Sequence, residues 1–251
     1  MNFYLFTLIG FIAQLIDGTL GMGFGLTSST ILITAGTSAA LASAAVHISE
    51  IGTTLASGVS HWHRENVDME VLYRLAIPGG IGALAGATFL SSIDIESSKL
   101  LISSILFVMG FVLLYRIGFS GSIRVFSVSE KSPSFFQYLG FSSGFVDAAG
   151  GGGWGPIVTP TLLATTSAEP RKVIGTVSAA EFIVALCASL GFLLSASRLN
   201  LDWSVIGGLA FGGIIAAPIA AKIVRVLPAR NLGIIVALGI IITNAFRLLT
   251  T

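Results

Sequence analysis

Charged residues are scarce in this chain. Only 10% of its 251 residues are Asp, Glu, Lys or Arg, whereas 54% are hydrophobic and the mean hydropathy is +0.92. A soluble domain carries about 25% charged residues, so the apolar excess is too large for one buried core. The sequence therefore predicts an all-α, polytopic transmembrane helical bundle with lipid as its solvent. The formal net charge of +1 gives no sign of nucleic-acid binding.

Cysteine and the common catalytic motifs are also missing. Cys187 is the only cysteine, which excludes an intramolecular disulfide. The sequence has no Walker loop, no HExxH, no CxxC and no nucleophile elbow. An enzyme would need a nucleophile with a base in reach, and only a serine near His47 offers that pair. His61 and His63 are two residues apart, so they do not share a helix face as metal ligands. We expect no enzyme activity, no metal and no cofactor.

Ten apolar segments follow one another along the chain. A spanning helix needs about 20 apolar residues, and four of the segments form two pairs that are interrupted by glycine. The interruptions are DGTLGMGFG at 17–25 and DAAGGGGWGP at 147–156. With each interrupted pair counted once, we expect about eight membrane elements, the first a retained helix and not a signal peptide. The segments are 2–16, 26–35, 39–60, 70–91, 98–117, 135–147, 156–166, 172–196, 203–224 and 231–249.

The two halves of the chain resemble each other. The first interruption recurs at an offset of 130 residues, with Asp17, Gly21, Gly23 and Gly25 matched by Asp147, Gly151, Gly153 and Gly155. Glu50 matches Glu181 with one residue inserted, and the run NVD at 66–68 matches NLD at 200–202 at an offset of 134. The longest polar stretch, 118–134, lies between the halves. We therefore expect two homologous repeats with discontinuous helices, at 1–117 and 135–251, joined by this linker.

Lysine and arginine in short loops indicate the orientation, because they stay in the cytoplasm. The linker at 118–134 is then cytoplasmic, and the acidic loop at 91–98 lies outside. The basic residues of the second half follow helices whose first-half counterparts end outside, which favours inverted repeats. Arg198 and Arg247 would lie on the outer side in that arrangement. The residues expected in the cytoplasm are Arg64, Arg116, Arg124, Lys131, Arg171, Lys172, Lys222, Arg225 and Arg230.

The glycine runs point to a binding site. Each glycine disfavours helix by about 1 kcal/mol relative to alanine, and broken helix survives at membrane depth only inside protein or beside a watery cavity. Two matched breaks are typical of a transporter's substrate site. A new helix is expected at about Leu26 and at about Pro156, with the proline at its first position. The two helix amino ends could then hold an anion, although the glycines could also serve only close helix packing.

Residues in and beside the breaks are the expected substrate contacts. Small hydroxyls there can donate to an oxyanion, or bond back to helix carbonyls. Trp154, whose counterpart is Phe24, can wall a cavity or fill space. The expected substrate-binding residues are Gly21, Gly23, Gly25, Thr27, Ser28, Gly151, Gly152, Gly153, Trp154, Gly155, Thr159, Thr176 and Ser178.

Four acids lie in the apolar segments, where a carboxylate costs about 2.5–3.5 kcal/mol and usually has a function. Asp17 and Asp147 precede the breaks, and we expect them to cap the amides of the broken helices. Glu50 and Glu181 lie inside helices, and we expect them to couple transport to protons. His47, three residues before Glu50 on the same helix face, is either its proton partner or a hydrogen-bonded structural residue. Cation binding is the other role open to these acids.

Three stretches make the chain resemble a known family, the sulfite exporter TauE/SafE family. They are DGTLGMGFG at 17–25, VHISEIGTTLASGVSHW at 46–62 and GGGGWGPIVTPTLL at 150–163, and IGTVSAAEF at 174–182 agrees as well. The resemblance covers essentially the whole chain. It implies a multi-pass secondary transporter of the bacterial inner (plasma) membrane with about eight helices. It also implies export of small sulfur-containing or organic anions such as sulfite, sulfonates or sulfoacetate.

Two transport hypotheses remain after these observations. The first is an anion transporter coupled to protons through Glu50 or Glu181, and the second is a Na⁺/H⁺ or divalent-metal transporter with the carboxylates as ligands. Helix amino ends suit an anion, whereas unwound carbonyls and carboxylates suit a cation. The expected partners are the substrate and the lipid bilayer, with a homodimer as one assembly that the sequence allows.

Overall fold

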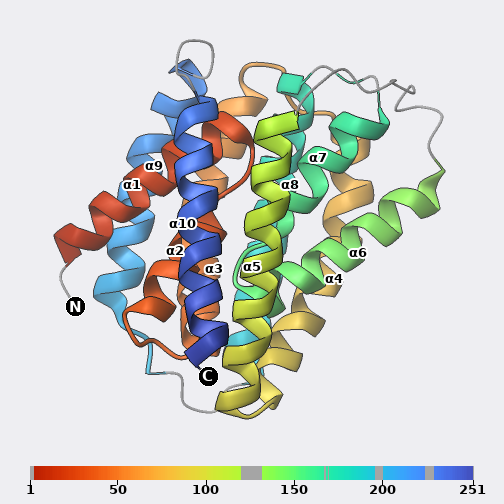
Figure 1. Cartoon of the computed structure of the whole chain (residues 1–251). Coiled ribbons are helices and arrows are strands. Elements are labelled where there is room, and N and C mark those ends of the chain that lie inside the picture. The colour runs from red at the N-terminus through yellow and green to blue at the C-terminus, as the bar shows by residue number, and fades with distance from the viewer. Residues whose placement is uncertain are drawn as a thin grey trace.

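The described part of the chain folds into helices (Figure 1). The computed structural model describes residues 3–119, 132–166, 168, 170–195, 200–223 and 229–250. Within these ranges the elements are α1 (Phe3–Leu20), α2 (Phe24–Thr34), α3 (Ala39–Trp62), α4 (Met69–Ser92), α5 (Ile95–Phe119), α6 (Pro133–Gly150), α7 (Trp154–Thr165), α8 (Pro170–Ser195), α9 (Trp203–Ile223) and α10 (Ala229–Thr250).

The ten apolar segments correspond to these ten helices, so the all-α prediction is confirmed for the described residues. The helices that follow the glycine runs begin earlier than predicted, at Phe24 and Trp154 instead of Leu26 and Pro156. Pro156 is therefore the third residue of α7 and not its first. The difference has little effect on stability, because the N–H groups of a whole first turn have no partner inside the helix.

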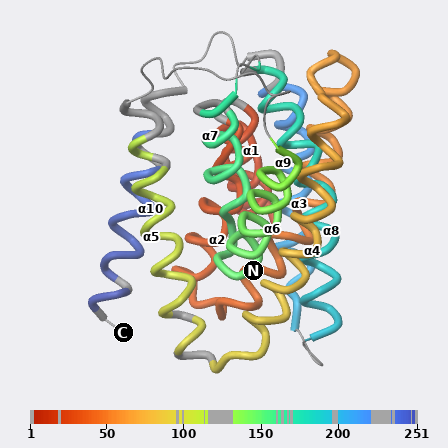
Figure 2. Tube along the Cα trace, turned by 90° about the vertical axis from the view of Figure 1, so that its right-hand side faces the viewer, coloured from red at the N-terminus to blue at the C-terminus, as the bar shows by residue number. Residues whose placement is uncertain are grey.

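Each glycine run reverses the direction of the chain. In Figures 1 and 2, α1 runs obliquely toward the middle of the bundle, and α2 runs back in the reverse direction. Helix α6 likewise enters obliquely, from the opposite side in Figure 1, and α7 runs back. The interrupted pairs are therefore two helical hairpins, and each pair turns inside the protein.

The hairpins pack on helices of the other half. The oblique helix α1 lies along α9, and α6 lies along α4, while α3 packs against α8, and α5 against α10. In Figure 1 the helices at matching places in the two halves, such as α3 and α8, run in opposite directions. Every hairpin is thus held mainly by helices encoded in the other half of the chain.

Glycine allows the oblique helices to approach so closely. A Cβ atom on Gly144 of α6 would overlap the carbonyl of Gly79 in α4. In the matching pair, a Cβ atom on Gly10 of α1 would overlap the carbonyl of Leu209 in α9. Small residues are the usual means of bringing helix backbones together in a membrane, where no hydrophobic effect acts between helices.

Three described helices are long and apolar enough to cross a bilayer, at Met69–Ser92, Arg171–Ser195 and Trp203–Ala220. Shorter apolar helices occur at Phe3–Gly18, Phe24–Thr34, Leu100–Val112 and Ala237–Phe246. Large side chains such as Tyr4, Leu194 and Phe246 lie exposed on the outside of the bundle. A bundle with an apolar exterior of this kind is stable in lipid and not in water.

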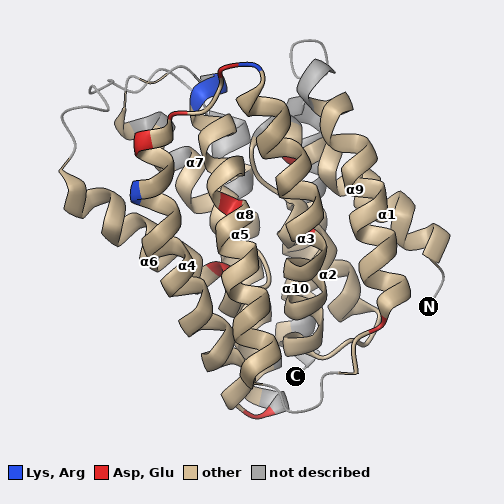
Figure 3. Cartoon of the chain, turned by 180° about the vertical axis from the view of Figure 1, so that it is seen from behind, with Lys and Arg blue, Asp and Glu red and all other residues tan. Residues whose placement is uncertain are grey.

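The described basic residues lie toward one end of the bundle (Figure 3). Arg64 lies in the connection between α3 and α4, Arg74 near the start of α4, and Arg171 and Lys172 at the start of α8. The positive-inside rule predicts that such an end faces the cytoplasm, and this orientation stays a prediction. Of the predicted linker at 118–134, residues 120–131 lie outside the described residues, and its two flanks belong to α5 and α6.

Candidate functional site

The two glycine breaks meet in the interior of the protein. A Cβ atom on Gly152 would lie 2.5 Å from the backbone nitrogen of Leu26, and one on Gly155 would lie 2.8 Å from the carbonyl oxygen of Gly21. A Cβ atom on Gly25 would in turn lie 2.8 Å from the Cα atom of Gly152. The breaks thus touch through backbone alone, which only glycine permits.

The turns themselves also require glycine. Gly21 and Gly151 have φ angles of 70° and 69°, and Gly23 and Gly152 have φ angles of 131° and 140°. Other residues rarely adopt such positive φ values, because the Cβ atom crowds the backbone. Gly153, which follows in the second run, adopts an extended φ of −174°.

Each break is held by a hydroxyl from the other hairpin. Ser29 of α2 donates a hydrogen bond to the carbonyl oxygen of Gly151, and Thr159 of α7 donates to the carbonyl oxygen of Gly21 at 2.8 Å. Both donor and acceptor of one bond lie 130 residues from those of the other. The two hairpins thus exchange equivalent hydrogen bonds.

The two aspartates at the breaks have unequal contacts. Asp147 Oδ1 accepts hydrogen bonds from the backbone N–H groups of Gly153 at 2.7 Å and Trp154 at 3.0 Å. Asp17 Oδ1 reaches only the N–H of Phe24, at 3.5 Å. A hydrogen bond of normal strength is about 2.7–3.2 Å long. The Asp147 carboxylate therefore satisfies N–H groups at the amino end of α7, whereas the Asp17 carboxylate leaves the N–H groups at the amino end of α2 nearly free.

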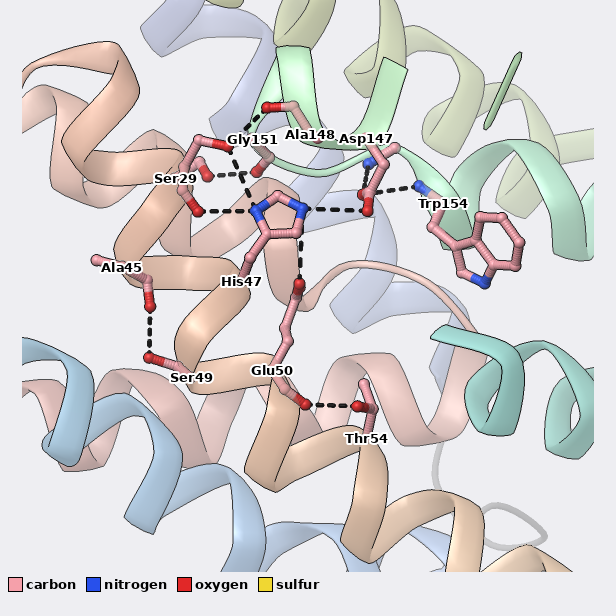
Figure 4. Close-up of polar contacts among 12 residues, drawn as sticks. Ser29, Ala45, His47, Ser49, Glu50, Thr54, Asp147, Ala148, Gly151 and Trp154 are labelled. Atoms are coloured by element: carbon pink, nitrogen blue, oxygen red, sulfur yellow. Dashed lines mark hydrogen bonds and ion pairs between the residues drawn. The ribbon is translucent and has the colours of Figure 1, made fainter. Parts of the chain in front are cut away.

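His47 connects α3 to the second break (Figure 4). Its Nε2 atom lies 3.1 Å from Asp147 Oδ2, and its Nδ1 atom lies 2.7 Å from the carbonyl oxygen of Ser43. A carbonyl oxygen only accepts, so Nδ1 carries a hydrogen. One further proton is then shared between Nε2 and the Asp147 carboxylate. This arrangement makes the imidazole and the carboxylate a buried, hydrogen-bonded pair.

Glu50 and Glu181 lie near this pair from opposite halves. Glu50 is 2% exposed, and its Oε2 atom lies 4.0 Å from His47 Nε2. Glu181 is 9% exposed and has no hydrogen-bond partner among the described residues. All four acids interact electrostatically, because Glu181 experiences the charges of Asp17, Glu50 and Asp147. Within the described ranges, no three His, Cys, Asp or Glu side chains are grouped closely enough to hold a metal ion.

Unpartnered hydroxyls mark the first half of the junction. Ser28 is fully buried, and neither its Oγ atom nor the buried Oγ1 atom of Thr27 has a hydrogen-bond partner among the described residues. Ile157 and Val158 occupy the matching places in α7. Hydroxyls that are buried without a partner cost about 1–3 kcal/mol each, so a ligand that accepts their hydrogens would be stabilised there.

Of three further predicted residues, one lies at a break and two do not. Trp154 is fully buried in the α7 start and donates its Nε1–H to the carbonyl oxygen of Val177 at 3.1 Å. Thr176 Oγ1 accepts a hydrogen bond from the backbone N–H of Asp68 at 2.9 Å. Ser178 Oγ donates to Ser57 Oγ at 2.8 Å. Trp154 thus lies at a break, whereas Thr176 and Ser178 join α8 to the first half elsewhere.

Two matched pockets open toward opposite ends of the bundle. The larger, of about 450 Å³, lies between the α2–α3 connection and the start of α9, and its lining includes Leu32, Ser38 and Asp202. The smaller, of about 30 Å³, lies at the basic end, between the end of α7, the first turns of α8 and the start of α4. Its lining includes the counterparts of those residues, Leu162, Ala168 and Asp68. The pockets are equivalent in sequence position but very different in volume.

Sequence reasoning missed two polar residues of the site. Ser43 donates to the carbonyl oxygen of Ala148 at 2.8 Å and, through its own carbonyl, orients His47. Gln14 is 1% exposed and its side chain hydrogen-bonds Asp17. Both could have been found from spacing, because Ser43 precedes His47 by four residues and Gln14 precedes Asp17 by three, which places each pair on one helix face.

Comparisons with known proteins agree with this geometry. The family model described as "Sulfite exporter TauE/SafE" matches residues 6–246. A Bacillus subtilis (strain 168) protein named "Probable membrane transporter protein YtnM" is 43% identical over 250 residues, which cover 97% of this chain and 82% of that protein. No solved structure matches the chain significantly. A membrane transporter architecture, a match over almost the whole length and a relative of this identity lead to one conclusion: the chain belongs to the sulfite exporter TauE/SafE family.

Proposed function

We propose that this membrane transporter exports a small sulfur-containing or organic anion, such as sulfite, a sulfonate or sulfoacetate, across the bacterial inner membrane. The description of its family and the name of its Bacillus relative support a transporter. Support for an anion comes from the junction of the two glycine breaks. The two breaks contact each other through backbone and through the hydroxyls of Ser29 and Thr159.

One observation carries the proposal: the amino end of α2 is an unsatisfied donor surface. Its first intrahelical hydrogen bond runs from Thr27 N to Gly23 O at 3.0 Å. The earlier amides, those of Gly25 and Leu26, precede that bond and have no helical partner. Together with the hydroxyls of Thr27 and Ser28, they supply hydrogen-bond donors at the positive end of the helix dipole. An oxyanion fits this set of groups, and a cation does not.

Alternating access follows from an inverted relation between the halves. The opposite directions of α3 and α8, the exchanged packing of α1 and α6, and the reciprocal hydroxyl bonds all support inverted repeats. The matched pockets of about 450 Å³ and about 30 Å³ are then the open and the closed mouth of one path. By this proposal the structure is open toward the outside and closed at the basic, cytoplasmic end.

Protons are the proposed coupling ion. His47, Glu50, Asp147 and Glu181 lie together at membrane depth, and the His47–Asp147 pair already shares a proton. Buried titratable groups of this kind form proton relays in pumps and transporters. The carboxyl group that is free of hydrogen bonds, that of Glu50 or Glu181, is the one able to load and release a proton during the cycle.

A binding screen tests the proposed function. Purified protein in detergent is expected to be stabilised against heat by one class of small oxyanions among sulfite, sulfonates, sulfoacetate, carboxylates and phosphate. A ligand present at about 100 times its Kd adds about 2.7 kcal/mol to the stability. Stabilisation by Na⁺ or a divalent metal, without any effect of the anions, would instead favour the cation hypothesis.

The orientation has its own test by cysteine labelling in a Cys187→Ala background. Ser134→Cys, at the exposed start of α6, is expected to resist an impermeant thiol reagent added outside intact cells. Ala35→Cys, exposed in the α2–α3 connection at the opposite end of the bundle, is the matched control and is expected to react. Both expectations follow from the positive-inside rule. The reverse labelling pattern would overturn the orientation.

A further inference from the structure

The Glu50 carboxylate lies against the amino end of α2. A Cβ atom on Gly25, the second residue of α2, would lie 3.1 Å from Glu50 Oε1. The side chain of Glu50 is buried, and its Oε1 atom has no hydrogen-bond partner among the described residues. In Figure 4, Glu50 extends from α3 toward His47 and the second break. A carboxyl group therefore already lies beside the first turn of α2.

The amino end of α7 offers no equivalent place. Asp147 accepts hydrogen bonds from the first two amides, and Pro156 has no N–H group to offer. The apolar residues Ile157 and Val158 stand where α2 has Thr27 and Ser28. Gly155 faces the backbone of Gly21 and Met22, and the Glu181 carboxylate is not among its nearest neighbours. The two hairpins thus present different groups at the starts of α2 and α7.

We propose that Glu50 is a built-in competitor of the substrate. Its carboxylate occupies the anion place at α2 when no substrate is bound, and it leaves that place, taking up a proton, when the substrate anion binds. This inference rests on the proposed function, because it assumes that an anion binds at α2. The physical reason is that two negative groups repel each other strongly in a site of low dielectric, whereas a neutral Glu50 does not repel the anion.

The hydrogen bonds made by Glu50 and by the titratable groups around it indicate which group can exchange the proton. The titratable groups that face it are His47 on its own helix, Asp17 of α1, Asp147 of α6 and Glu181 of α8, while α2 presents only backbone there. His47 is bonded at both ring nitrogens, and Asp147 is bonded through both oxygens. Glu50 is the group at α2 without such bonds, so it can change its charge without breaking a hydrogen bond.

Anion binding as a function of pH tests the inference. The probe is methanesulfonate, a sulfonate that stays charged from about pH 6 to about pH 8.5, and the measurement is its Kd in purified wild-type protein and variants. If binding takes up one proton, the affinity of the wild type falls by up to about tenfold for each pH unit as pH rises. Glu50→Gln is expected to remove this dependence and to bind at least about tenfold more tightly at the highest pH. Glu70→Gln, at an exposed carboxylate of α4 outside the site, is the control and is expected to keep the wild-type slope.

The outcomes separate this inference from the proposed function. Weaker binding by Glu50→Gln, or an unchanged slope, would show that Glu50 does not compete, while anion transport would stand. Absence of binding of methanesulfonate, sulfite and sulfoacetate by every variant would overturn the proposed function itself. If Glu50→Gln does not fold, Glu50→Asp serves instead, because the shorter side chain withdraws the carboxylate from Gly25. It is expected to bind more tightly than the wild type and to keep a pH slope.

Discussion

Replacement of Gly152 by leucine is expected to abolish transport while the protein still inserts into the membrane. Gly152 has a φ of 140°, a conformation that costs a side-chain-bearing residue about 1–3 kcal/mol. Any Cβ atom there would lie 2.5 Å from the backbone of Gly25 and Leu26. The leucine side chain would therefore push the two breaks apart and remove the donor surface of α2. The measurement is efflux of the best anion from cells or proteoliposomes.

Gly239→Leu is the matched control for this experiment. Gly239 lies on the exposed side of α10, and a Cβ atom there would have nothing within 4 Å. The same increase in side-chain volume should leave efflux close to the wild-type rate. If Gly152→Leu also transports normally, the glycine breaks serve helix packing and not the substrate.

The second large effect is expected at Asp147. Its replacement by alanine leaves His47 and the first two amides of α7 without an acceptor. Removal of one partner of a buried charged pair costs about 3–5 kcal/mol. For a chain of this size, the midpoint of thermal unfolding in detergent should fall by roughly 10 °C.

Asp17→Ala provides the comparison, since Asp17 matches Asp147 at the other break. Its one backbone contact is 3.5 Å long, so its removal should cost only about 1 kcal/mol. The double variant His47→Ala with Asp147→Ala should lose less stability than the two single variants combined, because no charge is left unpaired. Equal losses at Asp17 and Asp147 would contradict the unequal capping described above.

Hydropathy was sufficient to predict the helices. The apolar segments agree with the observed helices to within a few residues, because lipid forces every backbone group in a span into helical hydrogen bonds. The glycine breaks were also predictable, since four glycines in succession disfavour helix strongly. The start of α7 was misplaced by two residues, because Trp154 can begin the helix when a distant carboxylate, that of Asp147, satisfies its amide.

Contacts between the halves were not predictable from the repeat. The offset of 130 residues correctly pairs Ser29 with Thr159 and Gly21 with Gly151, but it does not reveal that each hydroxyl binds the opposite break. The unequal roles of Asp17 and Asp147 depend on small differences in the distance from carboxylate to amide, which is 3.5 Å at Asp17 and 2.7 Å and 3.0 Å at Asp147. Such differences follow from packing in three dimensions, and no spacing in the sequence records them.

The exchange of partners between the halves has a consequence for biosynthesis. Helix α1, which is translated before α9, packs along α9, and the carbonyl of Gly21 receives its hydroxyl partner from Thr159 in α7. A nascent chain that ends after α5 therefore has one hairpin inserted without the helix that supports it. The junction of the two breaks therefore cannot assemble until most of the second half has been translated.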